Sequence, residues 1–143
     1  MNTSEKVCVV AGCTSSIGRD SCIFMSKNGY AIAAIDHNDQ KGMDIVDEIN
    51  RNGGKANFWH FDFVSDGNIR KTFSEIYNTF GEINLVITTS KDMNKEDGSE
   101  NSSPKTVKQN FFEKLENRLN CSEYLFPFMS KDSCNTVVNI CTI

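Results

Sequence analysis

The stretch AGCTSSIG, residues 11–18, is a turn of small side chains between two apolar segments. The segment before it, VCVV at residues 7–10, is rich in β-branched residues and predicts a strand buried on both faces. The segment after it predicts a helix from about residue 17 to 28, with Gly29 as a typical C-terminal stop. A strand, a tight turn and a helix in this order bring backbone N–H groups and the positive end of a helix to one point. A diphosphate is stabilised at such a point.

The small residues of this turn have distinct expected roles. Gly12 permits the tight turn, Gly18 lets the helix pack closely on the strand, and two serines add hydroxyl donors. The two glycines by themselves do not distinguish a phosphate-binding turn from a turn of small residues that binds no ligand. The residues of this turn that we assign to cofactor binding are Gly12, Thr14, Ser15, Ser16, Ile17 and Gly18.

Strands and helices alternate along the rest of the chain. Further strands are predicted at residues 30–35, 56–61, 83–88 and 136–141, and amphipathic helices at about 41–52, from a Ser65 cap to 80, and over 107–126. The polar segment 91–105 is expected to be a mobile surface loop. This order predicts an α/β fold of the Rossmann type, a doubly wound parallel sheet with strand order 3-2-1-4-5. The length predicts one domain over residues 1–143.

Two acids end predicted strands at the same edge of this sheet. Asp36 lies 18 positions after Gly18, close to the spacing of about 20 expected for an acid that accepts hydrogen bonds from a ribose. Its carboxylate would repel a 2′-phosphate, and no arginine lies in the turn or just after Asp36, which favours NAD over NADP. Asp62 could accept from the adenine amino group. The alternatives are a solvated strand-end acid for Asp36 and a helix N-terminal acid for Asp62.

Composition restricts the other classes of function. The net charge is −4, and no run of basic residues suggests a nucleic-acid partner. No apolar run approaches the roughly 20 residues that span a membrane, and residues 1–6 lack a signal-peptide pattern, so a cytoplasmic location is expected. Without a C-x-x-C pair or clustered histidines no metal site is expected, and we interpret the cysteines as reduced core thiols. The cysteines are Cys8, Cys13, Cys22, Cys121, Cys134 and Cys141.

The whole chain resembles the first five strands of a short-chain dehydrogenase/reductase. The family motif T-G-x-x-x-G-I-G falls on residues 11–18, and the family's two cofactor acids fall on Asp36 and Asp62. The segments FGEINLVI (80–87), PFM (127–129) and VVNI (137–140) also resemble family segments at their usual spacing. The resemblance implies an NAD(P)-dependent oxidoreductase that transfers hydride between nicotinamide and an alcohol or carbonyl. It adds these residues to the cofactor site: Phe63, Thr88, Thr89, Ser90 and Ile140.

The chain also departs from the family pattern. Ser16 replaces the middle glycine, and N-N-A-G has become TTSK at residues 88–91. The resemblance aligns Lys114 with the Asn of the proton relay and Thr142 with the active-site serine. The printed sequence contains no Y-x-x-x-K motif, whose Tyr and Lys supply acid–base help worth about 10²–10⁴-fold. We therefore expect this chain alone to be inactive.

Two other functions stay open at this stage. The chain could be a non-catalytic module that binds a nucleotide, or a pseudoenzyme that acts through protein contacts. Ser16 and the TTSK segment favour these alternatives. The predicted fifth strand would form a sheet edge, through which the chain could form a homo-oligomer.

Overall fold

The computed structural model describes residues 5–62, 69–89, 128 and 136–140. Strands and helices alternate in it as the sequence predicts. The strands are β1 (Val7–Ala11), β2 (Ala31–Asp36), β3 (Ala56–His60), β4 (Leu85–Thr89) and β5 (Thr136–Ile140). The helices are α1 (Ser16–Lys27), α2 (Asp39–Arg51) and α3 (Arg70–Phe80).

All five strands are parallel and form one sheet with the order β3-β2-β1-β4-β5. This confirms the predicted fold class and strand order. Strand β1 lies in the centre, with Val9 in register with Ala33 of β2 and Val86 of β4. The order of the strands reverses at β1, and the first β-α turn therefore opens at the point where such sheets bind ligands.

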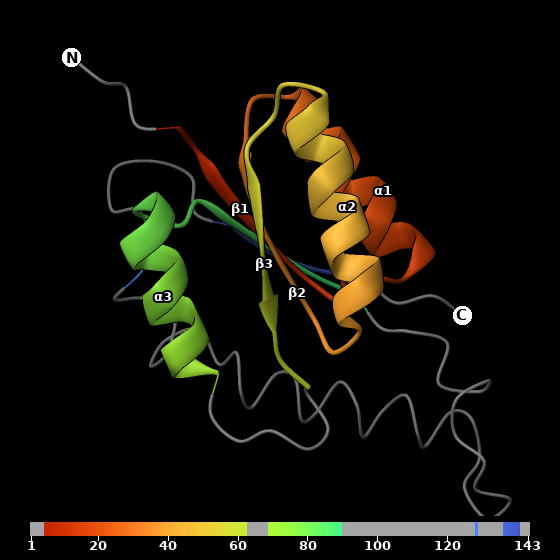
Figure 1. Cartoon of the computed structure of the whole chain (residues 1–143). Helices are drawn as coiled ribbons and strands as arrows, with labels where there is room; N and C mark the ends of the chain where they lie inside the picture. The colour runs from red at the N-terminus through yellow and green to blue at the C-terminus, as the bar shows by residue number, and fades with distance from the viewer. Residues whose placement is uncertain (1–4, 63–68, 90–127, 129–135, 141–143) are drawn as a thin grey trace, which may run out of the picture.

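Helices cover both faces of the sheet. In Figure 1, α1 and α2 lie on one side of the strands and α3 lies on the other. Alternate residues of β1 supply the two cores: Val7 and Val9 pack in the cluster that includes Phe73 of α3, whereas Cys8 and Val10 pack in the cluster beneath α1 and α2. This explains why the central strands are continuous apolar runs, because each residue faces one core or the other.

Several element boundaries differ from the prediction by one or two residues. The predicted strand at 83–88 is observed as Leu85–Thr89, because the Ile83 amide donates to the Phe128 carbonyl (2.7 Å) before the ladder with β1 is established. Tyr30 lies between α1 and β2 and not in the strand, and its amide donates to the Met25 carbonyl of α1 (3.1 Å). Helix α3 begins at Arg70 after Ile69, with no side-chain cap, and the Ser65 cap lies outside the described residues.

Other predictions also lie outside the described residues: the 91–105 loop, the 107–126 helix, Phe63, Ser90, Lys114 and Thr142. Among the helices that the structure describes, none is long and apolar enough to cross a membrane.

Candidate functional site

The turn after β1 is tied to the end of β2. The Gly12 amide donates to the Ile35 carbonyl at 2.8 Å, with Gly12 at a φ of 89°, which other residues rarely adopt. A side chain there would also meet the Thr89 carbonyl oxygen at 2.7 Å from its Cβ. Conformation and space therefore both require glycine at this position, as the motif predicts.

Ser15 caps the amino end of α1. Its Oγ accepts from the Gly18 amide at 2.9 Å and lies 3.0 Å from the Gly12 carbonyl oxygen, to which it can donate. A Cβ on Gly18 would collide with that carbonyl oxygen and with the backbone of Cys13. The helix thus begins directly against the turn, and its first amides, at Ser16 and Ile17, lie where helical N–H groups have no partner within the helix.

The buried side chain of Thr89 joins β4 to the same turn. Its Oγ1 donates to the Gly12 carbonyl oxygen at 2.9 Å and lies 3.1 Å from Ser15 Oγ. Thr89 stands where the resembled family has an Asn of N-N-A-G, and its hydroxyl provides a link between the sheet centre and the turn. Thr88 beside it is also buried. Although Thr89 replaces the Asn of the family motif, its side chain still forms a polar contact with the turn at this position.

Ser16 is the first residue of α1, and its side chain is exposed. It does not fill the interior of the turn. The replacement of the middle glycine instead adds a hydroxymethyl group on the outer surface of the turn, where a diphosphate would approach the helix.

Asp36 ends β2 with its carboxylate buried; the residue is only 3% exposed. Its Oδ2 accepts from the Thr14 amide at 2.9 Å and from Thr14 Oγ1 at 2.6 Å. Its Oδ1 accepts from the His37 amide at 2.7 Å and lies 2.9 Å from His37 Nδ1. The predicted ribose acid and the predicted diphosphate turn are therefore linked directly through Thr14.

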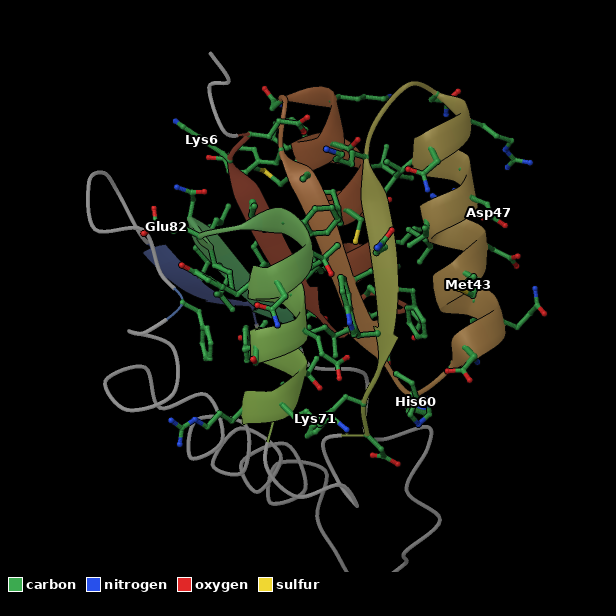
Figure 2. The ribbon with its side chains drawn as sticks, turned by 60° about the vertical axis from the view of Figure 1, so that its left-hand side comes forward. Lys6, Met43, Asp47, His60, Lys71 and Glu82 are labelled. Atoms are coloured by element: carbon green, nitrogen blue, oxygen red, sulfur yellow. The ribbon has the colours of Figure 1, made fainter. Side chains whose placement is uncertain are left out.

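A second carboxylate–histidine pair lies at the same edge of the sheet. His60 ends β3 in register with Asp36, and its Nδ1 lies 2.6 Å from Asp39 Oδ1 in the first turn of α2. Figure 2 shows His60 at the end of β3, near the start of α2. Asp62 follows two residues later and is half-buried. The pairing of His37 and His60 with carboxylates was not predicted from the sequence, in which only the adjacency of Asp36 and His37 points to it.

The structure brings most of the described cofactor residues to one edge of the sheet. Hydrogen bonds connect the residues of the turn to Asp36 and Thr89, whereas Ile140 ends β5 in register with Thr89. Ile17 is half-buried in the first turn of α1. The roles assigned to Phe63, Ser90, Lys114 and Thr142 stay predictions, because those residues are not described.

Three thiols lie buried beneath the turn, those of Cys8, Cys13 and Cys22. Burial raises the pKa of the Cys8 thiol from 9.0 to about 12. Burial, with the nearby Cys13 and Cys8 thiols, raises the pKa of Cys22 well above 9.0. A thiol that stays protonated is a poor nucleophile and a poor metal ligand. Among the described residues, no group of three or more His, Cys, Asp or Glu side chains could hold a metal ion.

A parallel sheet with a glycine turn at its switch point and an acid at the end of the second strand is an arrangement typical of α/β domains of the Rossmann type. The comparison with protein families is specific: residues 6–143 match the family described as short chain dehydrogenase. The chain belongs to that family of oxidoreductases.

Curated relatives agree with this assignment. A 3beta-hydroxysteroid dehydrogenase of Mediterraneibacter gnavus is 30% identical over 83 residues, which cover 58% of this chain and 30% of that protein. An uncharacterized oxidoreductase of Thermotoga maritima is 27% identical over 145 residues, which cover 98% of this chain and 55% of that protein. The chain thus spans about half the length, or less, of these relatives.

Solved structures share the fold. A citronellol catabolism dehydrogenase of Pseudomonas aeruginosa superimposes with a TM-score of 0.69 at 16% identity, over 94% of this chain and 54% of that one. The FolM alternative dihydrofolate reductase 1 of Brucella suis, solved in complex with NADP, gives a TM-score of 0.68 at 18% identity, over 94% of this chain and 56% of that one.

Proposed function

We propose that the chain forms the nucleotide-binding half of an NAD(P)-dependent oxidoreductase that transfers hydride between nicotinamide and an alcohol or carbonyl. The observation that carries the proposal is the link between Asp36 and Thr14, which holds the ribose acid against the diphosphate turn. Membership of the short chain dehydrogenase family supports the same reaction type. A cytoplasmic location, where buried thiols stay reduced, is part of this proposal.

The residues of the turn fit a dinucleotide. The amino end of α1 offers backbone N–H groups and its positive dipole to the diphosphate, and the absence of a Cβ at Gly18 allows the helix to begin there. Asp36 orients the adenosine ribose by accepting from its hydroxyls, and Asp62 accepts from the adenine amino group. When bound, the nicotinamide supplies the hydride chemistry.

NAD is the preferred cofactor in this proposal. The 2′-phosphate of NADP would lie close to the buried carboxylate of Asp36. Two negative charges close together in a poorly solvated site repel each other strongly. The first arginine of α1, Arg19, is paired with Glu48 of α2 at 2.7 Å. Arg19 therefore already pairs with a carboxylate, and this pairing disfavours its use as a partner for the 2′-phosphate of NADP.

Calorimetric titration with NAD, NADP, ADP-ribose and AMP tests the proposal. Asp36→Asn should weaken NAD binding about tenfold or more, because a charged hydrogen-bond acceptor is lost, and should narrow the preference for NAD over NADP. Asp47→Asn is the control, since Asp47 is an exposed acid of α2 that points away from the sheet in Figure 2. If none of the four nucleotides binds, the proposal is wrong.

A second candidate is a non-catalytic module that binds the nucleotide without turnover. The observations that favour it are Ser16 in place of the middle glycine of the family motif and TTSK at residues 88–91 in place of N-N-A-G. NAD binding together with no NADH oxidation across several carbonyl substrates would select this candidate for the 143-residue chain. Turnover of NADH would select the enzyme.

A further inference from the structure

Both oxygens of Asp36 already have partners in the folded chain. Each oxygen accepts from one backbone amide and contacts one side chain: Thr14 at Oδ2 and His37 at Oδ1. A carboxylate offers about four lone-pair sites in all. The 2′- and 3′-hydroxyls of a ribose are two further donors, and they need room on the same two oxygens. At least one side-chain partner must therefore give way before a ribose hydroxyl can bind to Asp36.

The partners of Asp36 differ in how easily they can leave. The two amides, of Thr14 and His37, belong to the backbone beside β2. Backbone hydrogen bonds hold this region in place, because the Gly12 amide donates to the Ile35 carbonyl and the Asp36 carbonyl accepts from the Phe61 amide. The Thr14 side chain is half-buried in the turn. The His37 side chain is 43% exposed and can rotate about its χ angles into solvent. Of these partners in the described part of the chain, His37 has the most freedom to move.

We propose that His37 is a specificity-determining residue that competes with the ribose hydroxyls for Asp36 Oδ1. This rests on the proposed function of the same site. In the free protein the imidazole occupies the oxygen that a ribose hydroxyl needs, at 2.9 Å, and it rotates away when an adenine nucleotide binds. The Thr14 contact stays in place and keeps the acid against the turn. His37 therefore lowers the affinity for any ligand that presents a ribose diol.

The test combines two variants with two ligands that differ only in the ribose. His37→Ala removes the competitor, and ADP should bind about three- to fivefold more tightly to it than to the wild type, because one competing, partly exposed hydrogen bond is lost. 2′,3′-Dideoxy-ADP has no hydroxyls to compete, so its affinity should be the same for both proteins. His37→Phe keeps the ring volume without the nitrogen and should bind ADP as tightly as His37→Ala.

A neighbouring pair provides the matched control. His60→Ala removes the imidazole paired with Asp39, both of which are exposed, and should leave the affinity for ADP unchanged. If His37→Ala leaves ADP binding unchanged or weakens it, or if His37→Phe binds ADP like the wild type, the inference is overturned. If ADP binds neither the wild type nor His37→Ala, the proposed function itself fails, which separates the two outcomes.

Discussion

Asp36 illustrates how one residue couples local structure to function. The residue ends a buried strand, and burying a carboxylate is costly unless hydrogen bonds offset the loss of water. Here the Thr14 amide, the Thr14 hydroxyl and the His37 amide all donate to it. The same hydrogen bonds fix the distance between strand β2 and the glycine turn. A change at Asp36 therefore affects both the stability of the turn and the recognition of a ribose.

Ser16 gives the first prediction at this scale. Ser16→Gly restores the middle glycine of the family motif and removes an exposed side chain from the surface that faces a diphosphate. We expect NAD to bind roughly two- to tenfold more tightly, as for a gain of one hydrogen bond, measured by calorimetry. Asp20→Gly, an exposed position later in α1, controls for the general effect of glycine in that helix. Weaker binding to Ser16→Gly would show that the serine hydroxyl is itself a ligand.

The buried thiols predict an alkaline loss of stability. The pKa of Cys8 is raised by burial to about 12 in the folded chain, above its ordinary value of 9.0. The folded state thus holds this proton more tightly than the unfolded state does. The contribution of the protonated Cys8 thiol to the free energy of unfolding is therefore fully present below pH 9. It falls as pH rises from about 9 toward about 12, by up to about 1.4 kcal/mol per pH unit.

Urea unfolding under reducing conditions, at several pH values above 8, measures this dependence. Cys8→Ala should show a shallower decrease in the free energy of unfolding than the wild type, although its overall stability is lower because a core side chain is shortened. Comparison of the two slopes removes the contribution of other alkaline groups. Identical slopes for the two proteins would contradict the prediction.

At the scale of elements, α1 and β1 are held together by close backbone contact. Gly18→Ala would force a methyl group into the Gly12 carbonyl oxygen and the Cys13 backbone, neither of which can move without breaking the turn. We expect a destabilisation of about 1–3 kcal/mol and weaker NAD binding. Asp20→Ala, exposed on the same helix, should change the free energy of unfolding by less than about 0.5 kcal/mol. Wild-type stability of Gly18→Ala would show that the helix can shift.

Most elements could be predicted because their apolar spacing reflects burial, on both faces of the central strands and on one face of each helix. Ile45, Val46 and Ile49 recur at helical spacing and are buried under α2 as expected. The start of β4 was misplaced because Ile83 is apolar and buried but bonds to Phe128, far along the chain. Hydrogen bonds between distant residues leave no local pattern, and for the same reason the Thr89 contact with the turn could not be foreseen.

The candidate site could be predicted only in part. Sequence spacing identified the turn and Asp36, since both follow from the order of strand, turn and helix. It could not show that Asp36 is already paired, because that depends on where the His37 ring and the Thr14 hydroxyl point in the folded chain. The competition proposed for His37 is therefore an inference that only the geometry allows.

At the scale of the whole molecule, β5 lies at one edge of the described sheet, next to β4. Its middle residue, Val138, is 39% exposed. An edge strand with an exposed apolar side chain can pair with another chain, and a charged side chain at that position opposes such pairing. We expect the 143-residue chain to associate as its concentration rises, and Val138→Lys to weaken that association.

Sedimentation velocity over a hundredfold range of concentration measures both effects. The weight-average sedimentation coefficient of the wild type should rise with concentration, whereas that of Val138→Lys should stay near the monomer value. Tyr77→Lys is the control, because Tyr77 is equally exposed, at 39%, but lies on α3 rather than on the edge strand. If Tyr77→Lys abolishes association and Val138→Lys does not, the chains meet through the helical face, and the edge of the sheet is not the interface.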